Sequence, residues 1–181
     1  MGSVVPLHPR APAPPPLDQL FRAAAPVRFS ARPVPRATLD ELFALVSLGP
    51  SGAEGSAARY VFIVSPAARA RLSRLLPEAA RGSVEAAPAC ALVGYDDGFA
   101  ELLMGRSAPA PHWRQSRLQL VRETAARNRA LQGAWLIIAA RTLGLEAAPL
   151  AEFDGAAVTK EFLGDVATAQ FLCVLGYPEA P

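Results

Sequence analysis

The residue types that most often perform chemistry are few and scattered in this chain of 181 residues. Its two histidines, His8 and His112, and its two cysteines, Cys90 and Cys173, share no spacing typical of metal ligands. The sequence contains no nucleophile elbow, no Walker loop and no dinucleotide fingerprint. Both cysteines lie in apolar runs typical of strands, where core thiols are more common than reactive ones. The sequence therefore predicts no metal site, and its motifs identify no catalytic residue.

The elements that must position any site are predicted from hydrophobic periodicity and from turn residues. Alternating apolar patterns and long apolar runs predict an α+β domain, because strands and helices follow one another irregularly. Thr38 and Glu41 form a capping-box pattern that predicts a helix start, and Asp154 predicts another. The expected helices cover residues 17–24, 38–48, 67–76, 113–143 and 155–163, and the expected strands cover 59–64, 89–95 and 170–175.

Composition excludes several classes of protein. Half of the residues are apolar (51%), so the chain can bury a core and is not disordered throughout. The net charge is only +2, carried by seventeen arginines and Lys160, which provides no basic stripe for nucleic acid. We therefore expect a small-molecule or protein partner and no nucleic acid.

The two ends of the chain differ in composition. Residues 1–16 contain six prolines and no apolar run long enough for a signal peptide, so we expect a Pro-rich, flexible arm followed by one domain over 17–181. The longest apolar stretch, residues 130–140, is about half of what a membrane span requires. These features predict a cytoplasmic protein that does not enter a membrane.

The longest expected helix, residues 113–143, is charged in its first half and apolar nearly all round from Leu131 to Ala140. A helix that is apolar on every side is buried on every side. In a domain of this size, such burial suggests a second subunit packed against the helix.

The order of several short motifs resembles the FMN-dependent nitroreductase family, closest to the branch that contains malonic semialdehyde reductase. The resemblance covers residues 17–178. The motifs are Arg28-Phe-Ser-Ala-Arg-Pro-Val-Pro35, Gly49-Pro-Ser-Gly-Ala53, Glu123-Thr124, Arg127-Asn128, Leu131-Gln-Gly-Ala-Trp-Leu136, Leu143-Gly-Leu145, Pro149, Phe153-Asp154 and Leu175-Gly-Tyr-Pro178.

The resemblance implies a nitroreductase-like fold with a central antiparallel sheet flanked by helices, and a homodimer with the long helix at its interface. It further implies FMN in a cleft between the subunits, NAD(P)H as the electron donor, and a small nitro, quinone, enone or aldehyde electrophile as substrate. The flavin supplies the redox chemistry and the protein supplies binding and orientation. The positions that match the family's cofactor contacts are Arg28, Ser51, Gly52, Ala53, Glu54, Ala151 and Glu152.

Several of these positions depart from the family pattern. The family's Arg-Ser pair before the crossing segment is replaced by alanines, and only Arg28 remains beside Phe29, as a phosphate contact or as a surface charge. Arg22 or Arg32 could substitute, although Arg32 could equally face solvent. Glu54 stands where the family has an asparagine, and it either turns to solvent or addresses a different ligand.

Glu152 replaces a glycine, which preserves a backbone donor if the side chain leaves the cleft. The sequence given ends three residues after Pro178, before the basic arm that the family uses to hold the flavin phosphate. Losing three charge-assisted hydrogen bonds would cost roughly 5–9 kcal/mol of FMN affinity. Two hypotheses therefore stay open: an FMN-dependent oxidoreductase with rewired phosphate contacts, and a flavin-free relative that binds something else in the dimer cleft.

Overall fold

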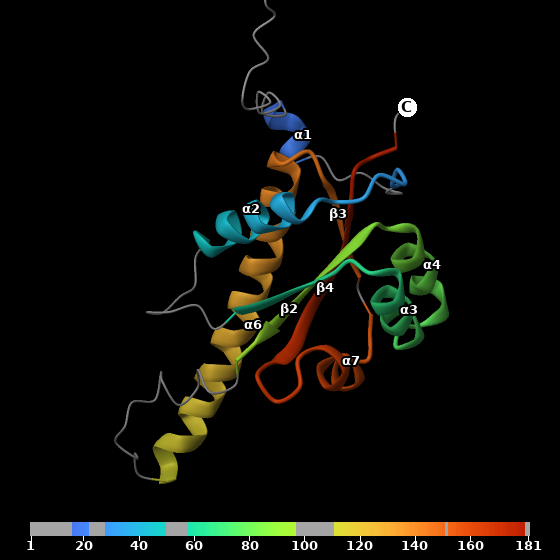
Figure 1. Ribbon diagram of the computed structural model, residues 1–181. Helices are drawn as coiled ribbons and strands as arrows, with labels where there is room; N and C mark the ends of the chain where they lie inside the picture. The colour runs from blue at the N-terminus through green and yellow to red at the C-terminus, as the bar shows by residue number, and fades with distance from the viewer. Residues whose placement is uncertain (1–15, 22–27, 50–57, 97–110, 151, 180–181) are drawn as a thin grey trace, which may run out of the picture.

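A four-stranded antiparallel sheet forms the centre of the computed structural model, which describes residues 16–21, 28–49, 58–96, 111–150 and 152–179. The strands lie in the order β1-β2-β4-β3 (Figure 1). They are β1 (Ala58–Ile63), β2 (Ala89–Tyr95), β3 (Glu146–Leu150) and β4 (Thr168–Gly176). The two inner strands, β2 and β4, are the most apolar because both of their faces are covered.

Helices cover both faces of this sheet (Figure 1). The described helices are α1 (Leu17–Phe21), α2 (Arg36–Ser47), α3 (Pro66–Arg74), α4 (Glu78–Ala86), α6 (Pro111–Thr142) and α7 (Gly155–Phe162). The long helix lies within two residues of its expected bounds, and the α+β prediction is confirmed. The sequence reading missed α4 and β3.

Two apolar cores lie on opposite sides of the sheet, because successive strand residues point to opposite faces. One core joins α2 and α6 to Ala89, Ala91 and Cys173. The other core joins α3, α4 and α7 to Cys90 and Leu92. The alternation along β2 thus divides the chain into three layers, helix on sheet on helix.

The start of α2 differs from its prediction, and the expected capping box is wrong. The helix begins at Arg36, two residues before Thr38, and its N-cap is Pro35 with no side-chain cap hydrogen bond. The ring of Pro35 fixes its φ at −63°, and with ψ at 150° the residue is extended, so that the helix starts directly after it. Thr38 consequently lies inside the first turn. The predicted cap at Asp154 is confirmed, since its carboxylate accepts from the Ala157 N–H at 3.0 Å.

No helix in the described part of the chain is both long and apolar enough to cross a membrane. The second half of α6 is shielded partly by α1 and α2 and partly by the sheet. Gly144 follows α6 at φ +73°, a left-handed conformation in which glycine is favoured, and it ends the helix as expected.

Candidate functional site

Arg28 lies in the segment that crosses beside the end of β4. Its carbonyl accepts from the Glu179 N–H at 3.0 Å, and the next residue, Phe29, forms a bridge with Pro178. Ser30 N–H donates to the Tyr177 carbonyl at 2.9 Å. The backbone of residues 28–30 is therefore fixed, while the Arg28 side chain is exposed.

Arg32 is held beside the same strand end. Its guanidinium lies over the ring of Tyr177, 3.9 Å from the ring centroid, in a cation–π contact. From the sequence, Arg32 was a possible substitute for the family's basic residues, and Tyr177 belonged only to the motif at residues 175–178. No signal in the sequence links the two residues, because they are 145 positions apart. The contact orients the Arg32 side chain beside the segment that carries Arg28.

Glu152 lies toward the opposite end of β4. It is exposed and follows β3, whose last residue, Leu150, pairs with Leu172. Seven residues separate Leu172 from Glu179, the partner of Arg28, which is roughly 23 Å of strand. The structure therefore does not bring Arg28 and Glu152 together within one chain. Ser51, Gly52, Ala53, Glu54 and Ala151 lie outside the described residues, so their assignment to the cofactor stays a prediction.

Gly49, the last described residue before Ser51, follows α2 and packs against α6. Trp135 Nε1 donates to the Leu45 carbonyl of α2 at 3.1 Å, and its ring packs on Gly49. A Cβ at position 49 would lie 2.8 Å from Trp135 Cδ1, so this contact requires glycine. The expected flavin segment thus follows a residue that packs on the last third of α6.

One side of α6 at this point is apolar and uncovered. Leu131 and Trp135, one helical turn apart, are each 42% exposed, while the next residue, Leu136, is fully buried. Exposed large apolar side chains also occur on α1 and α2, at Leu17, Phe21, Phe43 and Leu48. Clustered exposure of this kind marks an interaction surface more often than a free one.

Two polar side chains of the same helix are buried. Asn128 and Gln132 are about 5% exposed, and the Tyr60 hydroxyl donates to Gln132 Oε1. Burial raises the pKa of Tyr60 to about 12, so its hydroxyl keeps its proton near neutral pH. This hydrogen bond joins β1 to α6.

The thiols offer no nucleophile. Cys90 and Cys173 are both fully buried and unpaired, on adjacent strands but in different cores. Burial raises the pKa of Cys90 to about 12 and raises that of Cys173 further. The expectation of core thiols is confirmed. Within the described residues, no group of three His, Cys, Asp or Glu side chains could hold a metal ion.

The described residues near Arg28 have charges that can be compared with the needs of a phosphate group. A phosphate dianion requires cations or N–H donors, and two arginines, Arg28 and Arg32, project from one fixed segment at the end of β4. Glu179 adds one carboxylate nearby, through its backbone contact with Arg28. The chemistry of this end therefore suits a phosphate group, with fewer cations than a fully basic site.

Comparisons with known proteins extend over nearly the whole chain. A protein of Rhodopseudomonas palustris (strain TIE-1) named "Putative NADH dehydrogenase/NAD(P)H nitroreductase" is 40% identical over 171 residues, which cover 92% of this chain and 87% of its own length. A protein of Burkholderia lata with the same designation is 43% identical over 165 residues, or 89% of this chain and 85% of that protein.

Solved structures share the fold. The nitroreductase family protein of Streptococcus pneumoniae TIGR4 superposes with a TM-score of 0.69 at 17% identity, over 91% of this chain and 90% of its own. A protein of Exiguobacterium sibiricum, solved in complex with FMN, gives 0.68 at 14% identity, over 94% and 93%. No protein-family model matches the chain.

Proposed function

Because this chain belongs to the nitroreductase family of NAD(P)H-dependent oxidoreductases, we propose that it binds FMN between two copies of itself. In this proposal the chain is an FMN-dependent oxidoreductase that would use NAD(P)H to reduce a small electrophile of the nitro, quinone, enone or aldehyde type. The observation that carries the proposal is the 40% identity, over 92% of the chain, to a relative that is named an NAD(P)H nitroreductase.

The arginines of the crossing segment would hold the flavin phosphate. Arg28 starts from a backbone tied to Glu179, and Arg32 is oriented by Tyr177. A dianion gains most from guanidinium groups, which donate two parallel hydrogen bonds. These two arginines would replace, in part, the Arg-Ser pair of the family, where this chain has alanines.

The remaining contacts would come from the loop and from the segment after β3. Ser51, Gly52, Ala53 and Glu54 would approach the flavin ring from the loop that starts at Gly49, and Ala151 and Glu152 would offer backbone N–H donors. When bound, FMN accepts a hydride from NAD(P)H and passes it to an electron-poor substrate. The chain's part is to bind the flavin, to orient it and to exclude water from it.

A homodimer would complete this cleft. The loop of residues 50–57 follows Gly49, which rests on Trp135 beside the exposed apolar side of α6. A second copy covering Leu131 and Trp135 would therefore lie next to the loop. This arrangement supports a flavin site to which both copies contribute.

Visible absorbance provides the direct test. The purified protein is incubated with excess FMN, unbound flavin is removed by gel filtration, and the flavin retained per chain is measured. We expect one FMN per chain and oxidation of NADH or NADPH when a nitroaromatic or a quinone is added. A protein that stays colourless would contradict the proposal.

Two variants test the phosphate end. We expect Arg28→Gln and Arg32→Gln each to weaken FMN binding about tenfold or more, because each removes one charge-assisted hydrogen bond of about 1.5–3 kcal/mol. Arg74→Gln, an exposed arginine on α3, is the matched control and should leave the affinity unchanged. Equal affinities for all three variants would place the phosphate elsewhere.

The departures at Glu54 and at the alanines support a second candidate, a flavin-free relative that binds another ligand in the dimer cleft. That candidate predicts a dimer that retains no FMN. Stoichiometric FMN in the mass spectrum of the native protein would exclude it.

A further inference from the structure

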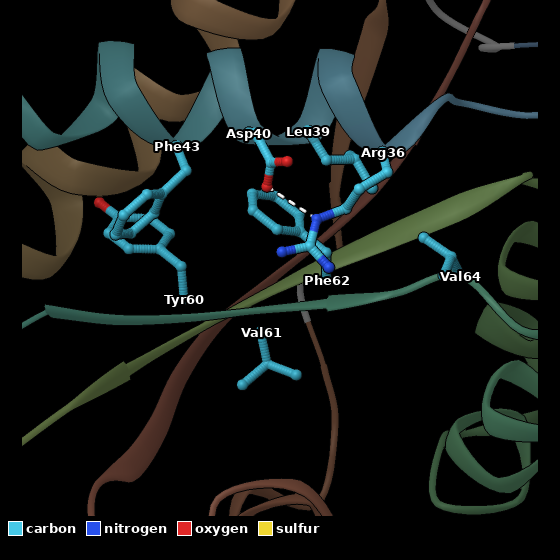
Figure 2. A pocket seen from close by; sticks show the side chains of 8 residues that line it. All are labelled: Arg36, Leu39, Asp40, Phe43, Tyr60, Val61, Phe62 and Val64. Atoms are coloured by element: carbon cyan, nitrogen blue, oxygen red, sulfur yellow. Dashed lines mark hydrogen bonds and ion pairs between the residues drawn. The ribbon is translucent and has the colours of Figure 1, made fainter.

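A groove runs between α2 and β1 on the outside of the sheet (Figure 2). Its volume is about 410 Å³. Leu39, Asp40 and Phe43 line it from α2, and Tyr60 and Phe62 line it from β1. Neither Arg28 nor Glu152, the described positions assigned to the flavin, lines the groove.

The walls of the groove are aromatic. The rings of Phe43 and Tyr60 meet edge to face with their centroids 6.0 Å apart, and Phe62 lies farther along the strand. Phe43 is 49% exposed and Val64, at the far end, is 45% exposed. Exposed aromatic and aliphatic side chains in a groove are suited to an apolar, extended ligand.

The rim of the groove carries a charged pair. Arg36 Nε lies 2.7 Å from Asp40 Oδ1, and both side chains are largely exposed. The Asp40 carboxylate can accept further hydrogen bonds, because each of its oxygens has two lone pairs. A ligand with one cation beside an apolar stretch would therefore find both partners here.

The N-terminal segment of this chain has that chemistry. Residues 1–15 read MGSVVPLHPRAPAPP, with five prolines, three aliphatic residues and Arg10 as the single charged side chain. Proline-rich segments favour the polyproline II helix, which aromatic-lined grooves recognise at a low entropic cost. The segment and the groove are thus complementary in apolar character, and Arg10 can share the Asp40 carboxylate with Arg36.

The segment is also long enough to reach. Arg141 Nη1 donates to the Leu20 carbonyl of α1 at 2.8 Å, and Trp135 Nε1 donates to the Leu45 carbonyl of α2. These two α6 residues are six positions apart, so α1 and α2 contact α6 at points about 9 Å apart along its axis. Fifteen residues of polyproline II span about 45 Å. The segment that precedes α1 can therefore turn back to α2.

We propose that the groove between α2 and β1 binds the chain's own N-terminal segment, residues 1–15, in an extended polyproline conformation. The prolines and aliphatic residues pack on Phe43, Tyr60 and Phe62, and Arg10 pairs with Asp40. Because the tether makes the contact intramolecular, its effective concentration is of millimolar order and a weak site is filled. The docked segment covers the outer face of α2, the helix that ends at the flavin loop.

Hydrogen exchange in the full-length protein is the first test, compared with a deletion of residues 2–15. We expect amides of residues 36–43 and 60–63 to exchange at least tenfold faster in the deletion variant. A synthetic peptide of residues 1–16, added to the deletion variant, should restore the slow exchange. Unchanged exchange rates after the deletion would overturn the proposal.

Groove variants identify the binding surface. By calorimetry, Phe43→Ala in the deletion variant should weaken peptide binding about tenfold, and Asp40→Asn about threefold. Val166→Ala, at another exposed apolar position, before β4, is the control and should bind as the parent does. Peptide affinity that is insensitive to Phe43→Ala would overturn the site, and insensitivity to Asp40→Asn would overturn the Arg10 contact.

A spin label separates docking within one chain from docking between chains. Ala11→Cys can be labelled alone, because Cys90 and Cys173 are both buried. We expect the label to broaden the NMR signals of residues 60–63 in its own chain. Broadening confined to an isotope-labelled deletion variant mixed with the spin-labelled chain would show docking to another copy, and would overturn the proposal.

Discussion

The two helical layers of this molecule differ in their helix caps, in their ion pairs and in the apolar side chains that they expose. We call the layer of α3, α4 and α7 the closed layer and the layer of α1, α2 and α6 the open layer. In the closed layer, Ser65 and Asp154 cap α3 and α7, and Arg71 pairs with Glu161 at 2.6 Å to join them. Among the described residues, most of the exposed large apolar side chains lie in the open layer.

The difference indicates which layer serves function. In the closed layer, α3 and α7 are capped and joined by an ion pair within one chain, and only α4 begins without a side-chain cap, at Pro77. The open layer instead shows Leu131 and Trp135 beside the start of the predicted flavin loop, and it carries the groove along α2. Both proposals, the dimer and the docked N-terminal segment, therefore concern the same layer.

The largest expected effect tests whether the closed layer is self-sufficient. Leu72→Ala removes a fully buried side chain from the core under α3 and should lower the free energy of unfolding by about 2–5 kcal/mol. Urea unfolding measures this loss, which should not depend on protein concentration. A loss that shrinks as the concentration rises would show that the closed layer also needs a partner.

The next effect tests the open layer. Leu131→Arg places a charge on the uncovered side of α6, and we expect dimer dissociation to become at least 100-fold easier, or about 2.7 kcal/mol. Light scattering after gel filtration should then give the 19.0 kDa monomer.

Val166→Arg, an exposed apolar position outside α1, α2 and α6, is the matched control and should leave the mass unchanged. A parent protein that is monomeric at every concentration tested would contradict the dimer.

The sequence predicted the elements whose signals are local. The bounds of β2 were predicted correctly because residues 89–95 form a continuous apolar run, and the Asp154 cap because its bond spans three residues. Strand β3 was missed, since its small residues and Pro149 have low strand propensity and pairing with β4 stabilises it. Helix α4 was missed for a similar reason: Val84 is its one fully buried residue.

The candidate site was predictable only in part. Arg28 was identified from its motif, but its tie to Glu179 and the stacking of Arg32 on Tyr177 are contacts between distant parts of the chain. No periodicity or spacing encodes such contacts, because they depend on how the crossing segment meets β4. The positions from Ser51 to Glu54 and Ala151 remain predictions that flavin titration must decide.

A smaller effect concerns pH and the buried thiol of Cys90, in the core of the closed layer. The pKa of Cys90 is about 12 in the folded chain, against 9.0 for an ordinary thiol. Above pH 9 the unfolded chain releases this proton and the folded chain does not, so stability falls as pH rises by about 1.4 kcal/mol per unit.

Well below pH 9 both states keep the proton, and Cys90 no longer makes the free energy of unfolding depend on pH. Cys90→Ala should therefore reduce the loss of stability between pH 9 and pH 10 by about 1 kcal/mol, because the unfolded thiol is already half ionised at pH 9; urea unfolding at the two pH values measures this difference. The same slope in the variant and in the parent would show that Cys90 titrates normally, and hence that its core is open to water.

The smallest expected effect compares helix starts in the two layers. Ser65→Ala removes the hydroxyl that accepts from the Ala68 N–H at 3.2 Å, and should cost about 1 kcal/mol of unfolding free energy. Thr38→Ala should cost nothing through capping, because α2 starts at Pro35 without a side-chain cap, and alanine is the better helix former. Equal losses for the two variants would mean that Thr38 caps α2 after all, and that the open layer is finished at its helix ends as the closed layer is.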